Sequence, residues 1–304
     1  MGRRWSVIPL ALTLAHAFSA VGDEPKFAYG KREDESKAPE WAASITSGFG
    51  AATGNAQNLN LSGGANAAHR FGEFGENLLS FDANAAIARS TLPVAVPSAT
   101  PGLAELTSIS QTTSELWSAR LRYDRFFGAN ATYGFVSTGG DVPAGKEFLA
   151  GGQVGYARAL YKTGTDELAL EVGIDYTYQR FVAGNPDSVN IVSLRSFLGY
   201  SGKPQKDLSY SISLEWLGNL NSEARPTGVV GSFGDDRVTG KVEVTWKALG
   251  NGHLGVRFRA LYDSAPAPRP LPTLPAGLQW PANYQPLANP LDTVSEIVLL
   301  YKLL

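Results

Sequence analysis

The sequence predicts an all-β protein, an antiparallel transmembrane β-barrel of about twelve strands with short periplasmic turns and long extracellular loops. Three observations lead to this prediction. Apolar and polar residues alternate with a period of two over most of the chain beyond Trp41. The connections between the predicted strands sort into short turns at one end and long loops at the other. The chain also begins with a segment that has the features of an export signal.

The composition of the 304 residues excludes several classes of protein. The absence of cysteine removes disulfide scaffolds, thiolate metal sites and thiol nucleophiles. The chain has 26 basic and 28 acidic residues, so it carries no basic excess of the kind that nucleic-acid binding requires. Beyond residue 20 no apolar run approaches the roughly 18 residues that a membrane-spanning helix needs.

The chain divides into three parts. Residues 1–20 are predicted to be a secretory signal peptide, because Arg3 and Arg4 precede an apolar run that ends in small residues. Residues 21–40 are charged and have no apolar period, so we expect a flexible periplasmic tail. Residues 41–304 are expected to form the barrel, located in the cell outer membrane of a Gram-negative envelope.

The predicted strands follow from side chains that point alternately to the two faces of a strand. Residues 168–179 show this most clearly, because Leu168, Leu170 and Val172 begin an apolar face while the opposite face is small or polar. The number of predicted strands is even, as bacterial outer-membrane barrels require. The predicted strands are 41–52, 58–71, 77–90, 113–127, 131–139, 148–162, 168–179, 189–201, 208–216, 238–247, 254–263 and 292–304.

A soluble periplasmic β protein would also alternate, and it is the alternative fold. Its polar faces should carry long solvated Lys and Glu side chains, whereas the second face here is mostly Ser, Thr, Gly, Ala and Asn, which suit a confined lumen. The connections favour the barrel too. With a periplasmic N-terminus, the long connections 91–112, 221–236 and 264–289 all fall on the external side.

Aromatic residues near the predicted strand ends are expected to form two girdles at the lipid–water interfaces. Tyr123, Phe127 and Tyr133 would belong to the periplasmic girdle. Trp117 and Tyr262 would belong to the outer one. Such rings are amphipathic and favour the boundary between lipid and water.

Two segments of the chain resemble a known family. Residues 48–61 read GFGAATGNAQNLNL, and residues 116–181 include LWSARLRYDRFFGANATYGF and GGQVGYARALYKTGTDELALEVGIDYTYQRF. These segments are similar to the salt-induced outer membrane protein family (domain of unknown function 481), and the resemblance covers much of residues 41–217. It implies an outer-membrane β-barrel without a defined biochemical activity, and it brings no catalytic residues.

The sequence predicts that the protein is not an enzyme and holds no cofactor or metal. Barrel enzymes typically use His near the outer leaflet or the outer mouth. Here His16 leaves with the signal peptide, while His69 and His253 are predicted at the periplasmic end, in a strand end and a turn. A lipid-active outer-membrane enzyme is therefore only the alternative function.

Two further motifs are interpreted as structural. Residues 140–146 match a phosphate-binding loop, but Glu147 stands where Ser or Thr should hold magnesium and a strand follows, so we reject a nucleotide site. Asp235 and Asp236 are adjacent carboxylates in an external loop, and we interpret them as solvated charges.

Charged residues on the predicted inward face are the candidate functional residues. One hypothesis is a selective pore in which an arginine ladder, Arg120 and Arg122 with Arg257 and Arg259, faces carboxylates across a constriction. The alternative is a salt-bridged interior that holds the barrel shut. The candidates for the lumen are Arg120, Arg122, Asp124, Glu171, Asp175, Arg195, Glu215, Lys241, Glu243, Arg257 and Arg259.

The connection 264–289 contains seven prolines around Trp280 and Tyr284, so we expect it to be stiff and extended. It would fold into the mouth as a lid, bind an external partner, or remain a surface loop whose prolines suppress strand pairing.

The predicted function is an outer-membrane barrel that is envelope-structural or forms a narrow passive channel. The expected partners are outer-membrane lipids, the barrel-assembly machinery during biogenesis and, if the lumen is open, small solutes. Nucleic acid is not an expected partner.

Overall fold

A computed structural model gives the fold of the chain. It describes residues 40–52, 57–72, 76–97, 104–268, 287–288 and 290–303. The predicted signal peptide, the predicted tail up to residue 39 and residues 269–286 of the Pro-rich loop lie outside the described residues. Within the described ranges, no helix is long and apolar enough to cross a membrane.

The described part of the chain consists of β-strands and their connections. The strands are β1 (Trp41–Ala52), β2 (Gln57–Phe71), β3 (Asn77–Pro97), β4 (Ala104–Phe127), β5 (Asn130–Asp141), β6 (Lys146–Lys162), β7 (Asp166–Phe181), β8 (Ser188–Gln205), β9 (Leu208–Asn219), β10 (Glu223–Arg225), β11 (Gly228–Val230), β12 (Asp236–Leu249), β13 (Gly252–Asp263) and β14 (Leu291–Lys302).

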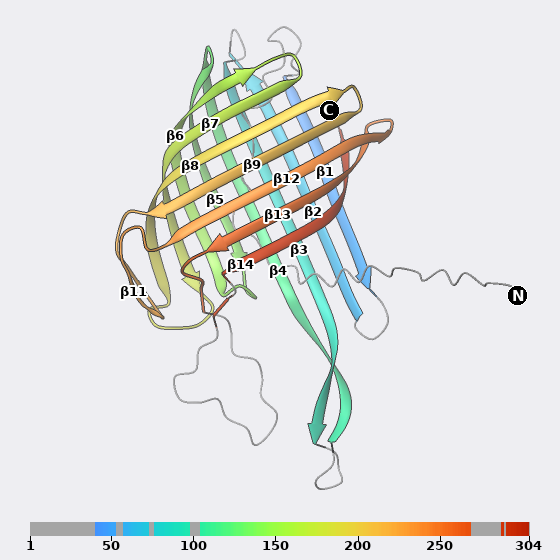
Figure 1. The fold of residues 1–304 in the computed structure, drawn as a ribbon, viewed down its shortest axis with the longest axis vertical. Helices are drawn as coiled ribbons and strands as arrows, with labels where there is room; N and C mark the ends of the chain where they lie inside the picture. The colour runs from blue at the N-terminus through green and yellow to red at the C-terminus, as the bar shows by residue number, and fades with distance from the viewer. Residues whose placement is uncertain are drawn as a thin grey trace, which may run out of the picture.

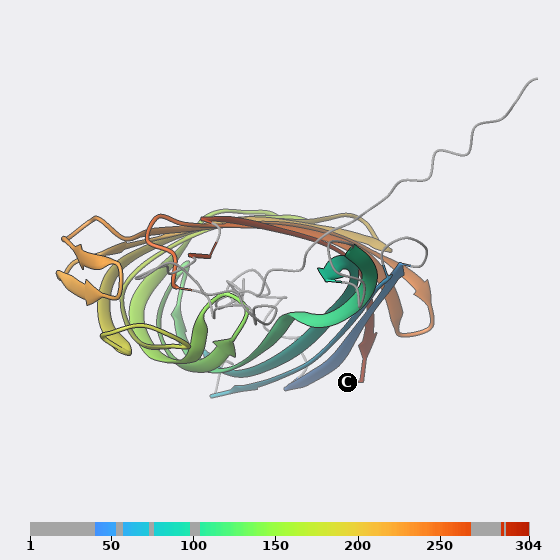
Figure 2. The same cartoon turned by 90° about the horizontal axis from the view of Figure 1, so that it is seen from below.

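Twelve of these strands close into one barrel in the order β1-β14-β13-β12-β9-β8-β7-β6-β5-β4-β3-β2, and every pair is antiparallel (Figure 1). The register pairs from Ser44↔Lys302 to Ser47↔Leu299 join the first strand to the last. Seen end-on, the barrel is flattened rather than circular (Figure 2). The predicted fold class is confirmed.

The connections sort by length as the sequence predicts. At one end of the barrel, called here the short-turn end, they are 72–76, 128–129, 163–165, 206–207 and 250–251. The opposite, long-loop end carries 220–235, which includes the β10–β11 hairpin, and 264–290. In Figure 1 the long-loop end is at the bottom.

One predicted loop is wrong. Residues 91–112 were expected to be a connection, but β3 and β4 continue as a paired hairpin beyond the barrel and leave only 98–103 between them (Figure 1). Pro93 lies inside this hairpin, opposite Ser108. It is tolerated because β3 pairs with β2 only as far as Thr91, so beyond that point β3 is an edge strand that needs no further amide donors on that side.

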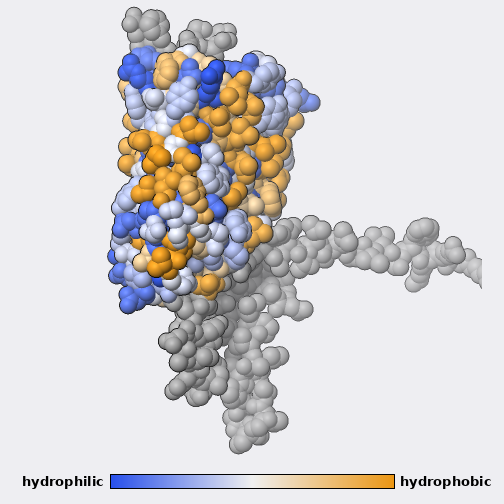
Figure 3. All heavy atoms as spheres, turned by 60° about the vertical axis from the view of Figure 1, so that its left-hand side comes forward, coloured by the Kyte–Doolittle hydropathy of each residue, from blue (hydrophilic) through white to orange (hydrophobic). Residues whose placement is uncertain are grey.

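The outer face of the barrel is apolar. Val136, Val154 and Ile297 expose 60%, 66% and 67% of their surface, whereas Gln153, the inward neighbour of Val154, exposes 3%. Figure 3 shows apolar side chains gathered over the middle of the wall, between more hydrophilic ends. A contiguous apolar surface of this extent is rare on a soluble monomer and suits contact with lipid.

Candidate functional site: the charged lumen

All eleven charged residues that the sequence places in the lumen lie on the inward side of the wall. Outward neighbours such as Val172 and Val244 are exposed and apolar. Eight of the eleven expose 8% or less of their surface: Arg120, Arg122, Asp124, Glu171, Asp175, Arg195, Glu215 and Arg259. Lys241, Glu243 and Arg257 are partly buried. That these eleven residues line a pore stays a prediction.

Arg122 on β4 is the centre of a buried ion-pair network. Its Nε donates to Asp124 Oδ2 at 2.9 Å, and its Nη2 donates to Glu171 Oε1 on β7 at 2.8 Å. The strands β5 and β6 lie between β4 and β7 in the wall, so the second pair bridges across the curvature of the lumen. Forked guanidinium–carboxylate contacts of this kind fix geometry as well as charge.

Arg195 on β8 extends the network. Its Nη1 donates to Glu171 Oε2 at 2.6 Å, and its Nε pairs with Glu215 on β9. Glu171 therefore lies between two arginines, which compensates the cost of burying its charge. These contacts link β4, β7, β8 and β9 inside the lumen through matched charges.

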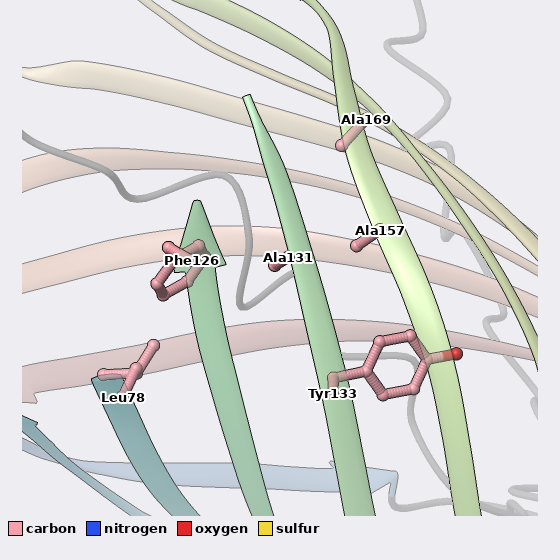
Figure 4. Packing of buried hydrophobic residues seen from close by; sticks show 6 residues of the cluster. All are labelled: Leu78, Phe126, Ala131, Tyr133, Ala157 and Ala169. Atoms are coloured by element: carbon pink, nitrogen blue, oxygen red, sulfur yellow. The ribbon is translucent and has the colours of Figure 1, made fainter. Parts of the chain in front are cut away.

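Tyr133 on β5 packs within the same network, and its predicted place in the periplasmic girdle is wrong. It is 4% exposed, lies under Arg122 with the guanidinium carbon 4.2 Å from its ring centre, and accepts a hydrogen bond from Arg195 Nη1 at 3.0 Å. The strand parity of β5 turns it inward, where it lies near Leu78, Phe126 and three alanines (Figure 4). A cation over an aromatic face is attractive, the more so when desolvated.

Two glycines give the Tyr133 ring its room. A Cβ at Gly155 on β6 would lie 2.5 Å from the Tyr133 Oη, and one at Gly173 on β7 would lie 2.8 Å from it. Both distances are shorter than a non-bonded contact allows. The ring can therefore lie against the wall only because these positions carry no side chain.

A second charge cluster lies on β12 and β13. Glu243 Oε2 is 3.1 Å from Lys241 Nζ and accepts from Arg257 Nε at 3.0 Å. The arginines of the predicted ladder divide between different groups, because Arg122 pairs with Asp124 and Glu171 whereas Arg257 pairs with Glu243. Arg120 instead lies 3.7 Å from Asp82 on the neighbouring strand β3.

Contacts also cross the lumen at the long-loop end. Lys146 Nζ on β6 lies 3.4 Å from Asp263 Oδ2 on β13, and both side chains are largely buried. Beside this pair, a Cβ at Gly145 would lie 2.1 Å from the carbonyl oxygen of Pro268, and Gly145 has a φ of +81°. The turn after β5 is thus packed against the chain that follows β13, which narrows the mouth.

The connection between β9 and β12 holds a third cluster, and Asp235 within it is not the solvated charge that was predicted. Asp235 and Glu223 are buried and both pair with Arg225, at 2.6 Å and 2.7 Å. Arg225 also donates to the carbonyl of Ala265 in the adjacent connection. Burial raises the pKa of both carboxyls above their ordinary values, and the neighbouring guanidiniums offset only part of this rise.

Inside the barrel, next to the mouth at the long-loop end, lies a cavity of about 90 Å³, called here the chamber. Its lining includes Arg120, Gln153, Asp175, Glu215 and Arg237. The Lys146–Asp263 pair lies on its long-loop side, and the Arg122 network lies toward the short-turn end. The chamber is therefore lined by charged residues of both groups together with apolar side chains.

The two histidines in the described ranges lie toward the short-turn end of the barrel. His69 stacks on Trp41 at 4.0 Å between ring centres, on the short-turn side of β2. His253 is the second residue of β13 rather than part of the turn before it. In the described ranges, no group of three or more His, Asp or Glu residues is placed to hold a metal ion.

Sequence reasoning missed several lumen residues. Lys146 fell in the rejected phosphate-loop motif, and Asp263 was treated as the end of a strand. Gln153 is the one amide in the run GGQVGYA, and its inward parity could have drawn attention to it. Which residues meet across the lumen could not be read from parity.

The family model described as "Protein of unknown function, DUF481" matches residues 45–228. Its description does not include the salt-induced role that the resemblance implied, so that role stays a prediction. Among curated proteins, none matches the sequence.

Solved structures with a similar arrangement are outer-membrane proteins. An outer membrane channel from Pseudomonas putida F1 is 10% identical, with 92% of this chain and 99% of that chain covered and a TM-score of 0.47. The translocator domain of the autotransporter NalP from Neisseria meningitidis is 14% identical, with 86% of each chain covered and a TM-score of 0.40. OmpT of Vibrio cholerae is 9% identical, with 86% and 96% covered and a TM-score of 0.37. At these scores the likenesses carry no argument about this chain.

Proposed function

This chain belongs to the family described as "Protein of unknown function, DUF481", and from that premise we propose that it is an outer-membrane β-barrel that passes small polar solutes through a narrow lumen. The apolar outer face supports a location in the lipid of the outer membrane. The inward face is polar and charged, which suits water rather than lipid.

The chamber is the observation that carries the proposal. It is a partly open space inside the lumen, lined by groups of both charge signs and by apolar side chains such as Phe135 and Leu261. A cavity of about 90 Å³ has room for a small polar solute, since about 10–15 Å³ on the same measure holds one water. Lys146 and Asp263, which meet on the long-loop side of the chamber, would act as its gate.

Swelling of protein-loaded lipid vesicles tests the proposal. Vesicles containing the refolded barrel should swell in isotonic glycine or urea and stay unchanged in isotonic raffinose, because only the smaller solutes pass. Lys146→Ala removes the gate pair and should speed the swelling. Absence of swelling in every solute, for both the wild-type protein and Lys146→Ala, would contradict the proposal.

A structural role in the envelope is the second candidate, and the Arg122 network favours it. Charges paired as closely as Arg122 with Asp124 and Glu171 stiffen a wall without any passage. This role predicts a folded, outer-membrane-located barrel that never swells vesicles. We propose no enzymatic activity, since His69 stacks on Trp41 and His253 lies at the start of β13.

A further inference from the structure

Gln153 on β6 is a buried polar side chain without a partner. It exposes 3% of its surface, and neither its Nε2 nor its Oε1 has a hydrogen-bond partner. Its outward neighbour Val154 is 66% exposed, so Gln153 points into the lumen, where it lines the chamber. An unsatisfied buried amide destabilises a fold, and native structures that retain one generally place a water or ligand against it.

The groups around this amide have both charge signs. Gln153 is in register with Phe135 on β5 and with Asp175 on β7. Arg120 lies over the Phe135 ring, with its guanidinium carbon 5.4 Å from the ring centre. Arg237 completes the opposite wall, and its Nη2 donates to Ser193 Oγ at 3.0 Å.

We propose that the chamber binds one small zwitterionic solute of amino-acid size, with the Gln153 amide as its neutral hydrogen-bonding partner. The solute carboxylate faces Arg120 and Arg237, and its ammonium faces Asp175. The amide donates to the carboxylate through Nε2 and accepts from the ammonium through Oε1. This inference rests on the proposed passage function, because the solute reaches the chamber through the lumen.

The mixture of charges selects the zwitterion. A simple anion would be placed beside Asp175, and a simple cation beside Arg120 and Arg237, so each meets a like charge in a confined space. A neutral amide has no charge to pair with either set. Only a molecule with both charges satisfies the two walls and the central amide together.

Isothermal titration calorimetry on the refolded barrel in detergent micelles tests the site. The probes are glycine, acetate, methylammonium and acetamide, which have similar sizes and differ in charge. Glycine should bind at least tenfold more tightly than each of the other three. Equal or tighter binding of acetate or methylammonium would overturn the proposed ligand class, and the absence of glycine binding would overturn the site.

Substitutions at Gln153 give the second test. Gln153→Met keeps the volume and removes both polar atoms, so it should lower glycine affinity at least tenfold and leave the barrel folded. Asn66→Ala, a lumen amide on β2 outside the chamber, should leave the affinity unchanged. If Gln153→Met does not fold, Gln153→Glu should shift the preference from glycine toward methylammonium. Unchanged glycine affinity in a folded Gln153 variant would overturn the role of this amide.

The two proposals fail separately. Glycine binding without vesicle swelling in any solute would support the binding site and overturn the passage function. Vesicle swelling without measurable glycine binding would support the passage function and overturn the binding site.

Discussion

Lys146 at the start of β6 and Asp263 at the end of β13 form an ion pair across the lumen, with 3.4 Å between Nζ and Oδ2. Four strands, β7, β8, β9 and β12, separate them by the shorter path around the wall. The flattened outline of the barrel brings the two walls within reach of a side-chain pair (Figure 2). The pair lies on the long-loop side of the chamber and next to the packed contact between Gly145 and Pro268.

Arg122→Met should strongly destabilise the barrel. The substitution leaves Asp124 and Glu171 buried with fewer partners, and breaking one side of a buried ion pair costs about 3–5 kcal/mol. Urea-dependent unfolding in lipid vesicles would measure the loss. Asp124→Asn in the Arg122→Met background should recover part of it, because Asp124 loses the guanidinium that pairs with it whereas Glu171 keeps Arg195. If Arg122→Met lowers the free energy of unfolding by less than about 1 kcal/mol, the network contributes little to stability.

Gly155→Ala should destabilise the barrel through Tyr133. The new Cβ would lie 2.5 Å from Tyr133 Oη and 2.4 Å from the carbonyl oxygen of Val172, so the ring and the backbone must shift, at a cost of about 1–3 kcal/mol. Gly134→Ala is the matched control on β5, because its Cβ would meet its nearest neighbour at 3.6 Å. The same unfolding assay compares them, and equal effects of the two substitutions would refute the close packing.

Val154→Lys tests whether the outer face meets lipid. A lysine near the middle of a lipid-facing wall costs about 2–4 kcal/mol, whereas near an interface it costs about 0–1. Leu249→Lys, next to the turn at 250–251, therefore serves as the control at the rim. Folding yield into vesicles should fall for Val154→Lys and stay near the wild-type level for Leu249→Lys. If both variants fold equally well into vesicles, the wall does not face lipid.

Arg225→Ala should loosen the connection 220–235 and leave the barrel intact. Without the guanidinium, Glu223 and Asp235 lose their shared partner, and the link to Ala265 is lost as well. Limited proteolysis should then cut this connection faster, while the heat-dependent gel-mobility shift of the barrel persists, because local opening need not involve the wall. Unchanged proteolysis would show that other contacts hold the connection.

Much of the wall was predictable because strand parity is a local property. The alternation around residues 168–179 places Glu171 and Asp175 inside and Val172 outside, as the structure has them. Tyr133 was misplaced because its strand end was given more weight than its parity. The inward face of β5 carries Phe135 as well as Tyr133, while Val136 is the one large apolar residue in the middle of its outward face, so the contrast between the two faces is weak.

Contacts between distant elements were not predictable. Parity fixes the face of a residue and its position in the strand fixes its height along the axis, but neither says which parts of the wall approach each other in a flattened barrel. The pairs Arg122–Glu171 and Lys146–Asp263 depend on that shape. Asp235 was taken as solvated because its burial depends on Arg225 and on a carbonyl from another connection.

Single-channel conductance in planar lipid bilayers, with the charges of the cross-lumen pair exchanged, tests the central claim most directly. Lys146→Asp places two carboxylates together, so repulsion should open the mouth and raise the conductance several-fold above the wild-type level. The double exchange Lys146→Asp with Asp263→Lys restores an attractive pair and should return the conductance toward the wild-type value. A wild-type barrel and both variants that fold and insert without any conductance would contradict a solute passage through this lumen.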